Sequence, residues 1–196
     1  MTLASAIILL FLVIDPFGNV AFFVAALKDV HPDRRRTVVM RELVIAYLVM
    51  VAFLFAGQPL LRILGISGPA LTIAGGVILF LIALRMVFPM RGQTLQEDIQ
   101  GEPLIVPLAI PYIAGPSVLA VEILLMSNEP ARWPVWLIAI TVAWAGTALV
   151  VFFGSQVAER LGPRGLVAIE RLMGMVLVAI AIQMFLTGAD LYFGRT

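Results

Sequence analysis

We expect an all-α integral membrane protein whose six transmembrane helices form two inverted three-helix repeats, with broken first and fourth helices. Three observations predict this fold. Of the 196 residues, 62% are hydrophobic and 13% are charged, whereas a soluble domain has roughly 45–50% apolar and about 25% charged residues. The apolar residues form six segments long enough to cross a bilayer. The first and the fourth segments each contain proline near the middle.

Hydropathy places the six spans at residues 3–27, 38–57, 68–88, 103–127, 134–157 and 166–187. Barrel strands alternate apolar and polar residues, but residues 77–83 read VILFLIA, so the spans are expected to be helices, which satisfy their own backbone groups in lipid. The first span lacks the cationic start and cleavage site of a signal peptide. The chain is therefore interpreted as one transmembrane domain over 1–196, with a first repeat at 1–88, a cytoplasmic loop at 89–102 and a second repeat at 103–196.

Lysine and arginine residues predict the orientation of these spans. Ten of them lie on one side and three on the other, and the positive-inside rule makes the richer side cytoplasmic. Both termini then lie outside, and the protein is expected to be a multi-pass protein of the inner (cytoplasmic) membrane. The ten are Lys28, Arg34, Arg35, Arg36, Arg41, Arg85, Arg91, Arg160, Arg164 and Arg171, and the three are Arg62, Arg132 and Arg195.

The two halves of the chain match each other at an offset of about 97 residues. Because each half has three spans, the second half starts from the opposite side of the membrane. Inverted repeats of this kind are typical of transporters. The matched pairs are Gly18 with Gly115, Gly57 with Gly154, Leu64 with Leu161, Gly65 with Gly162, Gly68 with Gly165 and, one position later, Gly76 with Gly174 and Met86 with Met184.

The first and fourth spans are predicted to be broken helices. Pro16 has no N–H and clashes within a continuous helix, but it fits the first position of a new half-helix with Asp15 as its N-cap. The twelve residues before the break are about 18 Å long, which puts the break near the middle of the hydrocarbon layer. In the fourth span, Pro111 prevents a regular helix, and Pro116 can begin a second half-helix with Gly115 as its cap.

Polar side chains near the breaks are candidate binding groups. Half-helix N-termini carry partial positive charge and face anionic groups in several transporter folds. Asp15 could bind an ammonium group, a proton or Na⁺, or it could serve only as a cap. Asn19 and Ser117 could hydrogen-bond a small polar ligand. Glu122 could carry a coupling proton or pair with Arg85. The alternative interpretation is that the prolines merely kink packed helices.

Several other functions are disfavoured. The net charge of +1 offers no basic surface for nucleic acid, and cysteine is absent. The only histidine, His31, lies in a polar loop, and there is no metalloprotease, serine-hydrolase or P-loop motif. We expect that the protein is not an enzyme and that it binds no metal and no cofactor other than a coupling H⁺ or Na⁺. The Arg34-Arg35-Arg36 run is interpreted as a topology signal rather than a lipid-recognition site.

Several motifs spread over almost the whole chain resemble those of the MarC family of integral membrane proteins. The resemblance implies a six-span fold and membership of a group of neutral amino acid transporters. The break motifs carry over to Asp15, Pro16, Gly18 and Asn19 and to Pro111, Gly115 and Pro116. Some family members have arginine where this chain has Thr72. The motifs are Asp15-Pro16-Phe17-Gly18-Asn19, Gly65-Ile66-Ser67, Ile73-Ala74-Gly75-Gly76, Arg85-Met86-Val87-Phe88-Pro89, Val106-Pro107-Leu108-Ala109-Ile110-Pro111, Ala114-Gly115-Pro116 and Ile169-Glu170-Arg171-Leu172-Met173-Gly174.

The expected function is secondary transport of small neutral amino acids such as glycine, alanine or serine, by alternating access and with H⁺ or Na⁺ symport. The substrate carboxylate would face the half-helix N-termini at 18–19 and 115–117, and its ammonium group would face Asp15. Limited room around Gly75 and Gly76 would select small side chains, although helix packing also explains these glycines. Export of other small metabolites, a passive channel, a non-transporting scaffold and a homo-oligomer remain alternatives.

Overall fold

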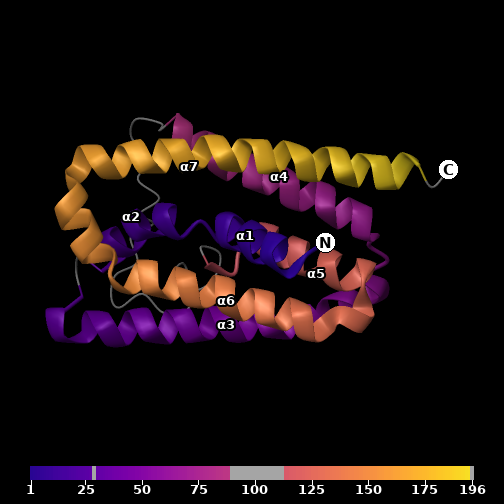
Figure 1. Cartoon of the computed structure of the whole chain (residues 1–196), viewed down its shortest axis with the longest axis horizontal. Coiled ribbons are helices and arrows are strands. Elements are labelled where there is room, and N and C mark those ends of the chain that lie inside the picture. The colour runs from indigo at the N-terminus through magenta and orange to yellow at the C-terminus, as the bar shows by residue number, and fades with distance from the viewer. Residues whose placement is uncertain (28–29, 89–112, 195–196) are drawn as a thin grey trace.

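The structure, a computed structural model, describes residues 1–27, 30–88 and 113–194, and these residues are helical apart from short connections (Figure 1). This confirms the expected all-helical class. The helices are α1 (Leu3–Ile14), α2 (Pro16–Ala26), α3 (Pro32–Ile63), α4 (Gly68–Val87), α5 (Pro116–Asn128), α6 (Trp133–Phe152) and α7 (Gly154–Phe193), with a short 3₁₀ helix, η2 (Pro130–Arg132), between α5 and α6.

Five stretches of the described chain are long and apolar enough to cross a membrane, and α5 is a shorter apolar helix. The first of these stretches, Leu3–Val20, includes α1 and the beginning of α2. Large apolar side chains such as Ile8, Leu48 and Leu81 are exposed on the outer surface. A surface of this kind suits contact with lipid rather than water.

Two helices extend beyond the predicted spans. Helix α3 has 32 residues and begins at Pro32, six residues before the predicted span, because proline at the first position starts a helix in the polar segment. Helix α7 begins at Gly154 and continues through a kink at Gly162 (φ 65°, ψ 172°), where a connector was predicted. Hydropathy identifies only the apolar part of a helix, so it does not detect polar turns that extend the helix at either end.

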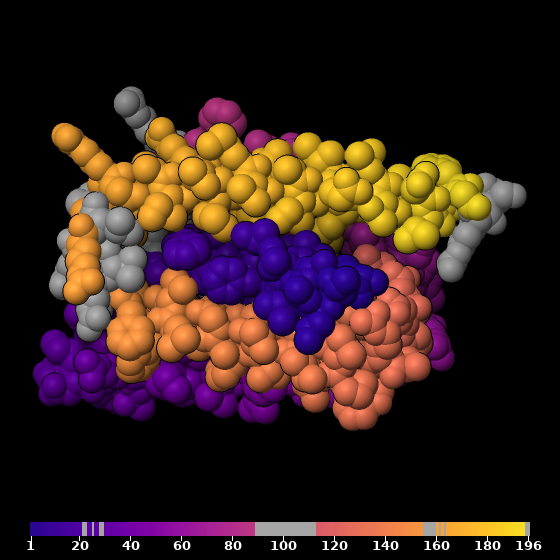
Figure 2. Space-filling view, viewed as in Figure 1, coloured from indigo at the N-terminus to yellow at the C-terminus, as the bar shows by residue number. Residues whose placement is uncertain are grey.

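The helices pack around a common core. Helix α4 lies along α7, and α3 packs against α5 and α6. The N-terminal segment lies between α6 and α7, as Figure 2 shows. Both halves of the chain contribute to this one buried core, which includes Leu10, Ile14, Met86, Ala114 and Leu177.

The contact between α4 and α7 is made by glycines. A Cβ atom on Gly76 would lie 2.9 Å from the carbonyl oxygen of Ala181, and one on Gly174 would lie 3.1 Å from that of Ala83. Small residues let helix backbones approach closely in lipid. Because the earlier residue of α4 pairs with the later residue of α7, the two helices run antiparallel.

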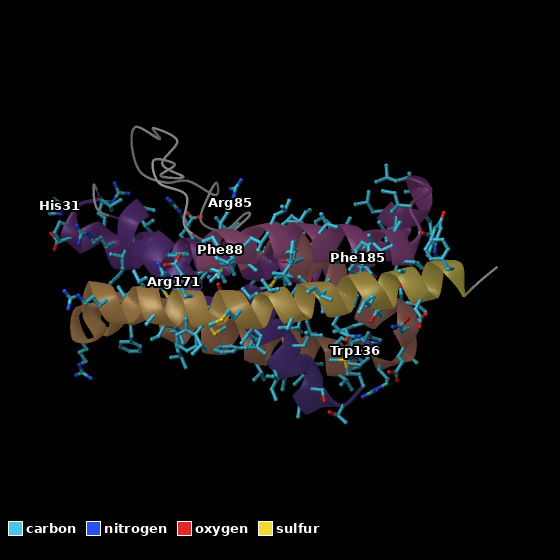
Figure 3. The ribbon with its side chains drawn as sticks, turned by 90° about the horizontal axis from the view of Figure 1, so that it is seen from above. His31, Arg85, Phe88, Trp136, Arg171 and Phe185 are labelled. Atoms are coloured by element: carbon cyan, nitrogen blue, oxygen red, sulfur yellow. The ribbon has the colours of Figure 1, made fainter. Side chains whose placement is uncertain are left out.

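The labelled side chains of Figure 3 lie toward the two ends of the bundle. His31, Arg85, Phe88 and Arg171 lie toward one end, whereas Trp136 and Phe185 lie toward the other. Arg85 and Arg171, two of the residues predicted on the cationic side, thus lie toward the same end. The assignment of the His31 end to the cytoplasm stays a prediction.

Candidate functional site

Asp15 joins the two halves of the first span. It has left-handed backbone geometry (φ 52°, ψ 65°), and among the described residues no other non-glycine residue has a positive φ. Its backbone N–H donates to the carbonyls of Phe11 and Leu12, which closes α1. Its Oδ1 accepts a hydrogen bond from the Gly18 N–H at 3.2 Å. One residue therefore ends α1 and caps α2, as predicted for the N-cap.

Asn19 completes the hydrogen bonding of this break. Its buried side chain donates from Nδ2 to the Ile14 carbonyl at 2.7 Å, a carbonyl at the end of α1, where intrahelical partners run out. Gly18 leaves room for Asp15, because a Cβ there would contact Asp15 Oδ2 and lie 2.9 Å from Met86 Cε. Hydrogen bonds from both sides therefore hold the break, and Gly18 leaves the space that the Asp15 carboxylate occupies.

The second predicted break lies at Gly115, directly before α5 begins. This residue is extended (φ −77°, ψ 163°) at the N-cap position of α5, and Pro116 is the first helical residue, as predicted. Gly115 itself has no side chain that could cap this end of α5. Ile113, Ala114 and Ser117 are buried around it, so this N-terminus faces the protein interior. Pro111 and the first half of this span lie outside the described residues.

The two breaks lie at similar depth. Helix α1 runs 12 residues before one break, and α5 runs 13 residues after the other. Their outer ends are joined, because the Met1 amino group lies 3.3 Å from Glu129 Oε1 and Arg132 Nη1 donates to the Met1 carbonyl at 2.9 Å. Each break is therefore about 18–20 Å from the same end of the bundle. Helices α1 and α5 also touch.

The two predicted glycines on α4 have different neighbours. A Cβ on Gly75 would lie 2.7 Å from Ala120 Cβ and 3.7 Å from the Cα of Ser117, so Gly75 lies beside the second break. Gly76 faces α7 instead, and its absent side chain allows that helix to approach. The structure thus brings Gly75 to the candidate site and places Gly76 in helix packing.

Glu122 is fully buried on α5, and neither carboxylate oxygen has a hydrogen-bond partner among the described residues. Arg85, the alternative partner, is exposed on α4, and no ion pair joins the two side chains in the described part of the chain. An isolated buried carboxyl group is costly in a membrane protein. Packing alone does not explain its presence.

Sequence reasoning missed three buried polar side chains. Glu42 on α3 is fully buried, with Oε1 held by Arg41 Nε at 2.9 Å. The hydroxyls of Thr72 and Thr147 each donate to a carbonyl of the preceding turn. Glu42 could have been noticed by the rule that singled out Asp15, because it is an acid inside a predicted span. The threonines carry no comparable signal.

Comparison with known proteins gives one consistent family relationship. Residues 1–193 match the family described as MarC family integral membrane protein. The chain is 45% identical over 189 residues to the UPF0056 inner membrane protein YhgN of Escherichia coli K12, covering 96% of each chain. It is 41% identical over 189 residues to a UPF0056 membrane protein of Buchnera aphidicola from Schizaphis graminum, again covering 96% of each. It is 29% identical over 196 residues to the UPF0056 membrane protein PYRAB13050 of Pyrococcus abyssi, covering 98% of this chain and 96% of that one. No solved structure matches significantly.

Proposed function

Because the chain belongs to the MarC family of integral membrane proteins, we propose that it is a secondary transporter of small neutral amino acids of the glycine, alanine and serine class. One observation carries the proposal. Two helix N-termini begin at similar depth inside the bundle, one with the acidic Asp15 and one with the glycine Gly115 at its N-cap position. An amino acid zwitterion has one positive and one negative group. Of the two breaks, one offers an acidic side chain and the other offers a helix N-terminus with partial positive charge.

The proposed binding mode assigns each charge of the substrate to one break. The N-terminus of α5 at Gly115–Ser117 suits a carboxylate, because the N–H groups of a first helical turn have no intrahelical acceptor and the helix dipole is positive there. The acidic side chain of Asp15 at the other break suits the ammonium group. Asn19 adds a polar contact, and the close approach of Gly75 to α5 limits the space for a side chain.

The proposed motion is the rocking of two inverted repeats around this site. Three features support an inverted arrangement. Gly65 and Gly162 both have φ near 65°. Gly76 meets Ala181 and Met184, and Gly174 meets Ala83 and Met86, each partner being shifted by the same 98 positions. Helix α2 contacts α6 and α7, and α5 correspondingly contacts α3 and α4.

Glu122 is the proposed coupling group. Acidic side chains inside membrane proteins serve as proton relays in pumps and transporters. Glu122 is on the same helix as the proposed carboxylate site and has no partner among the described residues. Its gain and loss of a proton would couple substrate movement to a pH gradient.

Counterflow in proteoliposomes tests the proposal. Vesicles loaded with unlabelled alanine are given labelled glycine, alanine, serine or leucine, with and without a pH step. We expect saturable exchange of the three small amino acids, exclusion of leucine and loss of exchange in Asp15→Asn. Asp190→Asn is the matched control, since Asp190 is an exposed acid of α7 remote from the break.

Other outcomes would point elsewhere. Flux without saturation or counterflow would identify a passive channel. Absence of exchange with every amino acid, in protein shown to be folded, would overturn the substrate assignment and favour export of other small metabolites. Normal exchange by Asp15→Asn would remove Asp15 from the binding site.

A further inference from the structure

A shallow groove of about 650 Å³ opens on the outer surface between the beginning of α3 and the end of α6. Its polar lining includes Arg36 and Arg41, and its apolar lining includes Met40, Val44 and Phe152. Met40 and Val44 are each more than 40% exposed. The groove is separate from the two helix breaks and has no part in the proposed transport.

The position of the groove along α3 places it at a membrane surface. Arg41 and Arg62 are 21 residues apart on α3, about 31 Å, which equals the thickness of a hydrocarbon core. Arg41 then lies at the boundary with the headgroup layer, and Arg36 lies about 7 Å farther out. Val44 lies on the inner side of that boundary. The groove therefore runs from the headgroup layer into the acyl-chain layer.

The two guanidinium groups are positioned by the protein. The Arg36 guanidinium lies over the Phe152 ring, 5.8 Å from its centroid. Arg41 is held by the fully buried Glu42, with 2.9 Å between Nε and Oε1. Glu42 compensates one of the two positive charges, so the groove keeps a net positive charge through Arg36. Arginine binds phosphate oxygens with two parallel hydrogen bonds more readily than lysine does.

We propose that this groove binds an anionic phospholipid, with the lipid phosphate at Arg36 and Arg41 and an acyl chain along Met40, Val44 and Phe152. An anionic phospholipid has a charged headgroup next to an apolar tail, and the groove correspondingly has arginine side chains next to apolar ones. The proposal adds a lipid-binding role to Arg36, beyond the topology signal indicated by the sequence. It does not rest on the transport function, because its test measures binding.

Native mass spectrometry of the purified protein in neutral detergent measures the binding. Phosphatidylglycerol and phosphatidylcholine with identical chains are titrated in parallel, and glycerol phosphate supplies a headgroup without a tail. We expect phosphatidylglycerol to bind more tightly than either. Arg36→Gln should weaken it about five-fold, the effect of one cation near an anionic lipid. Arg62→Gln, at the other end of α3, is the matched charge control and should change little.

Two further variants make the test independent of any single folding defect. Arg36→Lys keeps the charge and should bind with intermediate affinity, because the paired hydrogen bonds are lost. Val44→Trp keeps both arginines and should weaken binding by filling the path of the acyl chain. Equal affinity for the two lipids, equal effects of Arg36→Gln and Arg62→Gln, or binding of glycerol phosphate as tight as that of the lipid would each overturn the proposal.

Discussion

The left-handed geometry of Asp15 predicts a specific order of stability among its variants. Asp15→Ala loses the bond to the Gly18 N–H, worth about 0.5–2 kcal/mol, and puts alanine at φ 52°, which costs about 1–2 kcal/mol more. The free energy of unfolding should fall by about 1.5–4 kcal/mol in total. Asparagine in Asp15→Asn keeps an acceptor oxygen and tolerates left-handed geometry. The free energy of unfolding of this variant should therefore fall by less than about 0.5 kcal/mol. Asp15→Gly loses the cap but relieves the strain, and should lie between them.

Thermal unfolding of the four proteins in one detergent, followed by tryptophan fluorescence, measures this order. For a chain of this size Asp15→Ala should have a Tm lower by about 3–16 °C. The expected order is wild type, Asn, Gly and Ala, from most to least stable. An Ala variant as stable as wild type would refute the capping argument. A Gly variant less stable than Ala would refute the argument from left-handed geometry.

Three further predictions concern other parts of the molecule. In Gly76→Ala the new Cβ would lie 2.9 Å from a backbone oxygen of α7, so we expect the free energy of unfolding, measured by chemical denaturation, to fall by about 1–3 kcal/mol. Gly68→Ala, with open space around it, should change this free energy little. Equal losses in the two variants would contradict the packing argument. Glu122→Gln should keep counterflow but lose its stimulation by a pH gradient, and persistent stimulation would exclude it as the coupling group. A side-chain hydrogen bond from Arg132 lowers the pKa of Glu129. The stabilisation from the charged Glu129 is therefore complete above the ordinary carboxyl pKa and disappears as pH falls through the lowered pKa. The Tm difference between wild type and Glu129→Gln should accordingly shrink as the pH is lowered and close below that lowered pKa. A difference that persists there would contradict this.

Local chemistry made the helix breaks predictable. Proline disfavours a continuous helix, and with Asp15 or Gly115 before it as a cap the sequence predicted the break at Pro16 and the half-helix beginning at Pro116. Proline alone does not end a helix here, since Pro59 lies inside α3. The ends of α3 and α7 were predicted less well, because hydropathy reports where apolar residues lie and a helix continues through polar turns. The burial of Glu42 and the packing of Gly76 on α7 depend on which helices become neighbours. Sequence periodicity does not contain that information.

The close contact between α4 and α7 has a consequence for how motion in this protein can be measured. With glycines at the contact and backbone atoms opposite them, sliding by one turn would force larger side chains into the opposing backbone. Because α4 belongs to the first repeat and α7 to the second, the proposed rocking of the repeats should pivot about this contact rather than slide along it. The described chain has no free cysteine to compete with introduced labels. A pair of spin labels placed at the contact between α4 and α7 should report one constant distance, which gives an internal ruler for detecting changes farther from the pivot.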